Sequence, residues 1–164
     1  YAEFFETADG KPIEPGYFVT FEDGDKIKVA SGLSGEKIIG ITSATPSLVG
    51  NAAALRWKNK YMTDVFGRIQ YEYIEITKPS GNKYIEKRPI INPDWNPSDK
   101  YVPRSERPEW VKVGLIGQIV VNDDGTCKPG GYCKASQNGI ATSSDDGFYV
   151  MKRLDESHVL ILFR

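Results

Sequence analysis

Few side chains in this sequence have the types and spacing that catalysis or metal binding requires. The single histidine, His158, alternates with leucines near the end of the chain, a pattern typical of a half-buried structural histidine rather than of a Ser-His-Asp site. A zinc site needs four ligands, and besides Cys127 and Cys133 the sequence offers only His158. We therefore expect Cys127 and Cys133 to be plain reduced thiols.

Other catalytic and binding patterns are weak. A serine–lysine pair, for example Ser43 with Lys58 or Lys60, is conceivable, but serines and lysines are common in this chain. No glycine cluster carries the Lys-Ser/Thr of a phosphate-binding loop, and the acidic turns lack the ligand spacing of an EF-hand. Several aromatic side chains would suit a sugar-binding surface, but packing in a core or an interface is the ordinary role of aromatic residues. The aromatic residues concerned are Trp57, Tyr61, Trp95, Tyr101 and Trp110.

Glu3 and Glu6 belong to the opening motif Tyr-Ala-Glu-Phe-Phe-Glu. Two carboxylates three residues apart have no metal-binding or catalytic pattern of their own. From residue type alone, both are expected to be solvated surface charges.

Composition sets limits on the class of protein. The 164 residues are enough for one hydrophobic core, and 40% of them are hydrophobic. Lys plus Arg number 21 against 22 Asp plus Glu, so the net charge of −1 gives no electrostatic case for a nucleic-acid partner or a membrane surface. No apolar run reaches the length of a membrane-spanning segment.

Strand and turn patterns dominate the chain. Short runs rich in β-branched and aromatic residues are separated by turns that contain Asp and Gly, which predicts hairpins. Strands are expected at 17–21, 26–30, 37–42, 68–77, 83–91, 139–142, 148–153 and 159–163, with a long buried strand at 111–121. The sequence therefore predicts a mainly β fold, a compact barrel- or sandwich-like domain of short antiparallel strands with little helix.

Two segments depart from this pattern. The best helix candidate lies within Thr45–Trp57, where one or two turns are expected after Asn51 because Gly50 interrupts the segment. Asn92–Pro108 contains four prolines, which fix φ and lack a backbone donor, so it is expected to be a long loop. Long ordered loops are usually functional or cover an interface.

Several blocks together resemble one known family. They are Tyr1-Ala-Glu-Phe-Phe-Glu, Ile39-Gly-Ile-Thr-Ser-Ala-Thr-Pro46, Leu55-Arg-Trp-Lys58, Arg104-Ser-Glu-Arg-Pro-Glu-Trp110 and Asp123-Asp-Gly-Thr-Cys127 with Gly130-Gly-Tyr-Cys133. The chain resembles the C-terminal self-cleaving intramolecular chaperone domain of bacteriophage tail-spike and neck-appendage proteins, the G2 peptidase family. The likeness covers nearly the whole chain.

The resemblance implies a function. Residues 1–164 are expected to be a single chaperone domain that trimerises an upstream β-helical spike and then releases itself by one cut at its N-terminal border. A chain that starts at Tyr1 is expected to be the released product. Glu3 is implied as the general base. The residues considered as its helper are Lys60, Asp64, Arg104 and Arg107.

The resemblance also implies the partners of the protein and its location. The homotrimer would form on the virion appendage precursor in the host cytoplasm, without nucleic acid or membrane; no cofactor is evident, and assistance by a nucleotide stays open. Two alternatives remain: a retained structural or cell-wall glycan-binding tip of the spike, and a serine–lysine self-cleaving protease similar to LexA.

Overall fold

The computed structural model of the chain describes residues 1–22, 24–53 and 59–164. Strands dominate this part of the chain, and its helical segments are two single 3₁₀ turns, Arg104–Glu106 and Gln137–Gly139. The expectation of a mainly β fold with little helix is confirmed, and the described strands form three open sheets. The chain divides into two compact units, residues 1–54 with 103–164, and residues 55–102.

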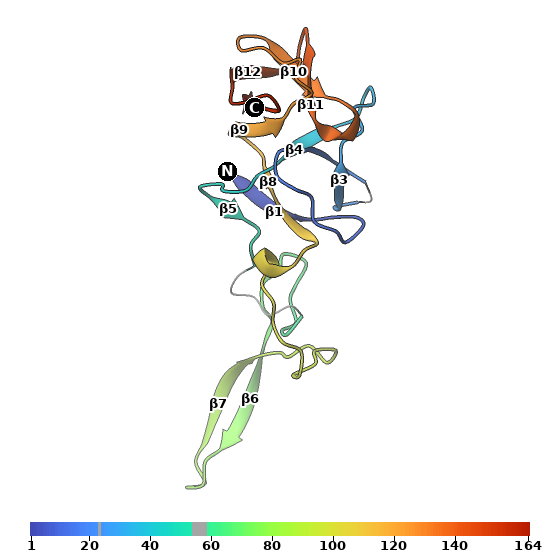
Figure 1. Cartoon of the computed structure of the whole chain (residues 1–164). Coiled ribbons are helices and arrows are strands. Elements are labelled where there is room, and N and C mark those ends of the chain that lie inside the picture. Colours follow the sequence, from blue (N-terminus) through green and yellow to red (C-terminus); the bar gives the residue numbers. More distant parts are fainter. Residues whose placement is uncertain (23, 54–58) are drawn as a thin grey trace. The chain divides into compact units, whose positions relative to one another are not determined.

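The first sheet of unit 1 has six strands in the order β3-β2-β4-β8-β1-β5 (Figure 1). Neighbouring strands are antiparallel except for β1 and β5, which are parallel. The strands are β1 (Ala2–Glu6), β2 (Phe18–Phe21), β3 (Ile27–Val29), β4 (Ile38–Thr42), β5 (Val49–Gly50) and β8 (Trp110–Gly114).

The second sheet of unit 1 has five antiparallel strands in the order β11-β10-β12-β13-β9. Its strands β9 and β11 lie at the two edges, so each pairs with one neighbour inside the sheet. The strands are β9 (Gly117–Asn122), β10 (Tyr132–Ala135), β11 (Ala141–Ser144), β12 (Phe148–Arg153) and β13 (His158–Phe163).

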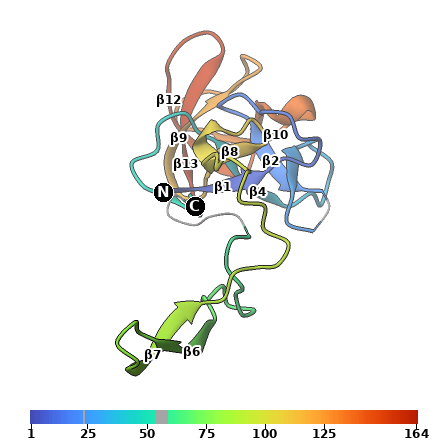
Figure 2. The same ribbon diagram turned by 90° about the horizontal axis from the view of Figure 1, so that it is seen from below.

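The core of unit 1 lies between these two sheets. Phe148 stacks on Phe18 of the first sheet at 5.4 Å and on Phe163 of the second sheet at 4.7 Å, between ring centroids. Ile41 and Ile161, one from each sheet, belong to the same buried cluster. Such apolar burial is the main driving force for joining the sheets. Figure 2 shows the strands of both sheets and the two chain termini gathered in this unit.

Unit 2 contains a two-stranded antiparallel hairpin of β6 (Tyr71–Thr77) and β7 (Lys83–Pro89). Tyr73 and Ile85, which share one face of the hairpin, are 70% and 71% exposed, and Tyr84 on the other face is 42% exposed. A lone two-stranded hairpin is only marginally stable in water. The strand predictions for 68–77 and 83–91 are thus confirmed, with slightly shorter strands.

The expected long strand at 111–121 is two strands. β8 ends at Gly114 and β9 begins at Gly117, and the two belong to different sheets. Gly117 has a φ of +109°, a conformation open mainly to glycine, which lets the chain turn from one sheet into the other. The apolar pattern alone could not place this break because both strands consist largely of apolar and β-branched residues.

The helix expected in 45–57 is wrong for the described part of that segment. Residues 45–53 form bends and the short strand β5, and Asn51 and Ala53 have φ values of +53° and +51°, which an α-helix does not contain. The remainder, 54–57, lies outside the described residues. Asn92–Pro108 is a loop as expected, with one 3₁₀ turn.

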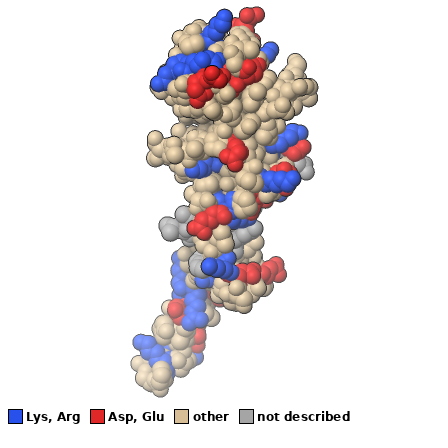
Figure 3. Space-filling model, viewed as in Figure 1, with Lys and Arg blue, Asp and Glu red and all other residues tan. Residues whose placement is uncertain are grey.

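Positive and negative side chains are interspersed on the face of the molecule in Figure 3. This arrangement agrees with the near-zero net charge. In the part of the chain that the structure describes, no helix has both the length and the apolarity needed to cross a membrane.

Candidate functional site

Glu3 lies in β1, inside the six-stranded sheet. It is opposite Val113 of the antiparallel neighbour β8 and opposite Gly50 of the parallel neighbour β5. The residues on either side of it, Ala2 and Phe4, are buried, whereas Glu3 is half-buried on the other face of the strand. Because directly opposed residues share a face of a sheet, Glu3 lies on the face of Val113, which belongs to a second, smaller buried apolar cluster, and on the opposite side of the strand from Ala2 and Phe4.

Gly50 forms the surface against which Glu3 lies. A Cβ atom at residue 50 would be 2.5 Å from the phenol oxygen of Tyr1 and 3.0 Å from Cγ of Glu3. Since real Cβ contacts are almost never that short, a side chain at this position would displace Tyr1 and Glu3. A glycine inside a strand often marks such a close approach.

Tyr1 is the neighbour of Glu3 on the same face of β1, and its phenol donates a short hydrogen bond to Oε1 of Glu3. This hydrogen bond, and to a lesser extent desolvation and the carboxylate charge, raises the pKa of Tyr1 above its ordinary value. Within the described residues, no hydrogen bond reaches the second oxygen, Oε2, of Glu3. The carboxylate is thus fixed at one oxygen and open at the other.

A second set of contacts holds β1 from the side of β5. The Asn51 side chain donates to the carbonyl oxygen of Phe4 at 2.8 Å, and Arg104 donates to the Asn51 carbonyl at 2.5 Å and to its side-chain oxygen. The Arg104 guanidinium lies 3.8 Å from the ring centroid of Trp110. Trp110 is thus partly covered by Arg104, and Arg104 connects the 3₁₀ turn to β1 through Asn51.

The other expected helpers of Glu3 have separate contacts. Arg107 pairs with Glu109, at the end of the loop before β8. Lys60 and Asp64 belong to unit 2, where Lys60 lies 5.0 Å from the Trp95 ring centroid and Asp64 pairs with Arg68. None of these contacts involves Glu3, so the identity of its helper stays a prediction.

The serine–lysine alternative spans both units. Ser43 lies in unit 1, where its backbone N–H donates to the carbonyl of Lys112 at 2.9 Å. Lys60 lies in unit 2, and Lys58 lies outside the described residues. The lysine beside Ser43 in unit 1 is Lys112, whose ammonium donates to the carbonyl of Ala44, and no hydrogen bond joins it to the Ser43 hydroxyl within the described residues.

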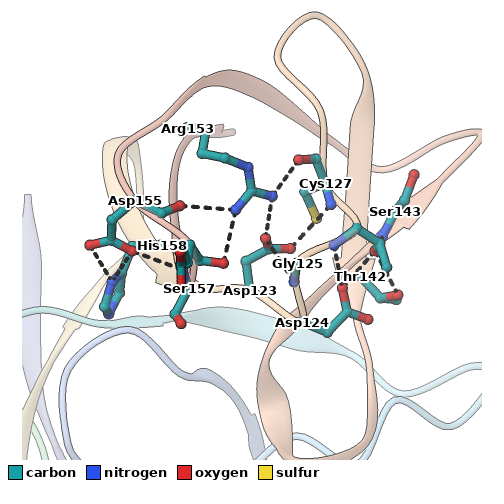
Figure 4. Close-up of polar contacts among 12 residues, drawn as sticks. Asp123, Asp124, Gly125, Cys127, Thr142, Ser143, Arg153, Asp155, Ser157 and His158 are labelled. Carbon is teal, nitrogen blue, oxygen red and sulfur yellow. Dashed lines mark hydrogen bonds and ion pairs between the residues drawn. The ribbon is translucent and has the colours of Figure 1, made fainter.

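His158 shares one face of β13 with Leu160 and Leu162, as expected, and it is half-buried. Its Nδ1 lies 2.8 Å and 2.9 Å from the two carboxylate oxygens of Asp155 (Figure 4). The backbone N–H of Ser157 and the ring of His158 lower the pKa of Asp155 below its usual range. The Asp155–His158 pair closes the turn between β12 and β13.

Arg153 forms the centre of a structural cluster beside that turn (Figure 4). Its guanidinium pairs at 2.5 Å with Asp123, whose side chain is fully buried, and donates to the carbonyl of Cys127 at 2.6 Å. Asp123 also accepts from the backbone N–H groups of Gly125 and Cys127. The acidic turn is therefore held by internal hydrogen bonds.

Cys127 and Cys133 are free, buried thiols, in agreement with the expectation. Burial raises the pKa of the Cys127 thiol far above its ordinary value and raises that of Cys133 to about 11. A thiol is nucleophilic as the thiolate, so these cysteines are inert core residues at neutral pH.

The comparisons with known proteins bear on the role of this site. The family described as Peptidase_G2, IMC autoproteolytic cleavage domain, matches residues 1–158. The chain belongs to this family. The resemblance seen in the sequence motifs is thereby confirmed, and the fold around Glu3 is that of an intramolecular-chaperone cleavage domain.

Relatives of the chain are phage proteins and one bacterial protein. It is 46% identical over 147 residues to the pre-neck appendage protein of Bacillus phage B103, covering 90% of this chain and 16% of that protein. Identity to the pre-neck appendage protein of Bacillus phage phi29 is 43% over 146 residues, covering 89% and 16%. Identity to the putative phage-related protein YobO of Bacillus subtilis is 32% over 160 residues, covering 96% and 19%.

Two solved structures share the fold. The C-terminal fragment of phi29 gene product 12 has a TM-score of 0.75 and 39% identity, covering 100% of this chain and 99% of the fragment. Pre-mature phi29 gene product 12 has a TM-score of 0.78 and 39% identity, covering 100% of this chain and 21% of the other. The chain thus spans about one sixth of the length of the curated phage relatives.

Sequence reasoning missed two members of this site. The sequence pattern predicts Gly50 as a helix interruption, although a glycine within an otherwise apolar segment also signals close approach of another backbone or side chain. Tyr1 was assigned no role, and its position two residues before Glu3 is the signal that could have placed both on one face of a strand. Glu3 itself was found by resemblance to the family.

Proposed function

We propose that this chain is the self-releasing chaperone domain of a longer phage appendage or spike precursor, and that Glu3 is the general base of a single cut near the domain's N-terminal border. The observation that carries the proposal is the fixed position of the Glu3 carboxylate on β1, held through Oε1 by Tyr1 and open at Oε2. Family membership supports the cleavage itself.

The proposed chemistry is a hydrolysis of the precursor's own backbone. Glu3 takes a proton from a water molecule, and the resulting hydroxide oxygen adds to the scissile carbonyl. The C–N bond then breaks, the proton passes to the leaving amine, and the products are a carboxylate and an amine. Backbone N–H groups near the carbonyl would stabilise the negative charge that develops on its oxygen.

The height of the barrier indicates that a site with few catalytic groups is sufficient for this cut. A single cut that takes about an hour corresponds to a barrier of roughly 22 kcal/mol. Intramolecular placement of the reacting groups supplies about 7–11 kcal/mol in well-aligned cases. The folded chain holds its own bond in place, so one positioned carboxylate with few helpers is enough for a reaction that occurs once.

The proposed assembly role is to bring three precursor chains into register as a homotrimer. A β-helical spike has mostly non-local contacts, which makes its folding slow and prone to misalignment. A domain that trimerises first raises the effective concentration of the three chains. The exposed apolar side chains of unit 2, such as Phe66, Tyr73 and Ile85, support a surface that is covered by other copies.

Release after folding would leave the spike trapped by slow unfolding, independent of the chaperone. We place this assembly in the host cytoplasm, on the virion appendage precursor, with no cofactor assigned.

Two alternative functions are tested alongside this proposal. A retained glycan-binding tip predicts that mature particles still contain the domain, which mass spectrometry of the particles detects. A LexA-like serine–lysine mechanism predicts that changing Lys60, and not Glu3, stops the cut in the full-length precursor.

A further inference from the structure

The strand β9 has an unpaired edge. Its backbone pairs with β13 on one side, and the N–H of Asp123, just past its end, donates to Ser157 on that same side at 2.8 Å. The N–H of the preceding residue, Asn122, points the other way and donates to Gly16 at 2.9 Å. Because the direction of backbone groups alternates along a strand, Val120 and Gln118 also direct their N–H and C=O groups to the outer edge.

These outward groups have no partner within the described residues. At the Asn122 end, the edge is covered: the Asn122 side chain donates to the carbonyl of Pro15, and its backbone N–H donates to that of Gly16. Beside Val120 and Gln118, no described strand pairs with β9. An uncovered edge of this kind is a template for a further strand.

A groove with a volume of about 540 Å³ runs along this edge. One wall is β9, and the opposite wall is the loop after β4, which contributes small side chains with hydroxyl groups. Tyr1 lines the same groove. The residues that line the groove include Tyr1, Ser43, Thr45, Ser47, Gln118 and Val120.

The pairing of β1 leads into this groove. β1 runs antiparallel to β8 with Ala2 opposite Gly114, and the N–H of Leu115 donates to the carbonyl of Tyr1 at 3.0 Å. If this ladder is continued by one position, the residue before Tyr1 lies opposite Ile116, which lines the groove. The ladder extends no further, because β9 belongs to the other sheet and its Gly117 pairs with Phe163 of β13. A precursor segment before Tyr1 therefore leaves the β1–β8 ladder at Ile116, where it is already at the groove beside β9.

We propose that the residues immediately before Tyr1 in the precursor bind in this groove as an extended strand along the free edge of β9. This inference rests on the proposed function, since it concerns the substrate segment of the proposed cut. Main-chain hydrogen bonds to Gln118 and Val120 hold the segment, and the hydroxyl-bearing wall at 43–47 favours small or polar side chains. Binding in the groove fixes the scissile bond relative to Glu3 of β1.

The first test removes one outward donor in the full-length precursor. Val120→Pro deletes the outward N–H and keeps the β13 pairing, because proline is tolerated at edges where the N–H faces outward. We expect the self-cut to slow by at least about tenfold, since lost register displaces the scissile bond. The matched control is Val29→Pro in β3, the edge strand of the other sheet, which is expected to cut within about twofold of the unchanged precursor.

A second measurement needs no change in β9. Hydrogen exchange is followed in the uncut Glu3→Gln precursor and in the cleaved, unchanged protein. The amides of Gln118 and Val120 are expected to exchange at least about tenfold more slowly before the cut. The amides of Ile119 and Val121, which face β13 in both states, are internal controls and are expected not to change.

The outcomes separate this inference from the proposed function. Equal exchange of Gln118 and Val120 before and after the cut overturns the strand-addition inference, whether the edge is open in both states or covered by a second copy in both. If the Glu3→Gln precursor cuts itself, the general base is wrong, and the exchange is measured on the unchanged precursor before its cut. An unchanged cutting rate in a folded Val120→Pro precursor also overturns the inference.

Discussion

The phenol of Tyr1 donates a hydrogen bond to the carboxylate of Glu3, its neighbour on the same face of β1, and both side chains lie against Gly50 of β5. The two strands are parallel, with Glu3 opposite Gly50 in the register. A residue with no side chain on one strand therefore makes room for a fixed carboxylate on the next. This relationship gives the site its first testable consequence.

Gly50→Ala should impair the self-cut in the full-length precursor. The added Cβ would meet the Tyr1 phenol at 2.5 Å and Glu3 Cγ at 3.0 Å, so the carboxylate must move. A displacement of about 1 Å can cost about 100-fold in rate, and we expect a loss of about 10–100-fold in the rate of appearance of the released domain on a denaturing gel. Val49→Ala in the same strand is the control, and a comparable loss there would indicate a general effect on β5.

The Tyr1 phenol should titrate above its ordinary pKa of 10.0, because the hydrogen bond to the Glu3 carboxylate favours the neutral phenol. The hydrogen bond is therefore fully present below pH 10.0 and is lost as the pH rises through the higher pKa of the folded state. The titration is followed by the NMR shifts of the Tyr1 ring. Glu3→Gln should lower the pKa of Tyr1, and an unchanged pKa in that variant would mean that the two side chains are not bonded in solution.

Stability should fall in alkaline solution because of the buried thiols. The pKa of Cys133 is raised from 9.0 to about 11, and that of Cys127 is raised as well, so the unfolded chain loses these protons first. The stabilisation that the neutral Cys133 thiol gives the folded chain is complete below pH 9.0 and is lost as the pH rises towards 11. Denaturant titrations between these pH values should give a falling free energy of unfolding.

A separate control tests whether the cysteines cause this fall in the free energy of unfolding with pH. A Cys127→Ala, Cys133→Ala double variant should show a flatter dependence of unfolding free energy on pH, whatever its absolute stability. Both thiols of the unchanged chain should also react slowly with a thiol reagent at pH 8 until the chain is unfolded. An equally steep slope in the double variant would assign the effect to other groups.

Arg153→Leu should destabilise unit 1. It leaves the fully buried carboxylate of Asp123 without its cation and removes the donor to the Cys127 carbonyl. Breaking one partner of a buried ion pair costs about 3–5 kcal/mol; because Arg153 itself is partly exposed, we expect about 3 kcal/mol in the free energy of unfolding from denaturant titration. Lys152→Leu, at the exposed neighbouring position, should change it by less than about 0.5 kcal/mol.

Much of the β architecture could be predicted because its signals are local. The turn around Gly24 combines acidic residues with glycine between apolar runs, and it connects β2 and β3, which pair as a hairpin. The similar turn at Gly147 connects β11 to β12, which are separated by β10 in the sheet. The division of 111–121 into two strands could not be predicted. It depends on the long-range partners of β8 and β9, and both strands have a similar apolar, β-branched composition.

The site was harder to predict than the fold. Nothing local distinguishes Glu3 from Glu6, which lies on the same strand and forms an exposed ion pair with Lys26. The difference comes from Gly50, 47 residues away in the sequence, and from the parallel pairing of β1 with β5, a contact that no local pattern encodes. Likewise, one or two helical turns are predicted after Asn51 because alanines favour helix, but Ala53 has a φ of +51° and the Asn51 side chain is held by the carbonyl of Phe4 in β1.

The central claim is that the Glu3 carboxylate performs the cut, and the most direct measurement is the fraction of full-length precursor cleaved over time with Glu3→Gln. Gln keeps the size and the hydrogen-bonding oxygen of the side chain and removes its basicity, so we expect an assembled, uncut trimer. Glu6→Gln is the matched control in the same strand and should cut at the normal rate. Cleavage of the Glu3→Gln precursor at the unchanged rate would contradict the account.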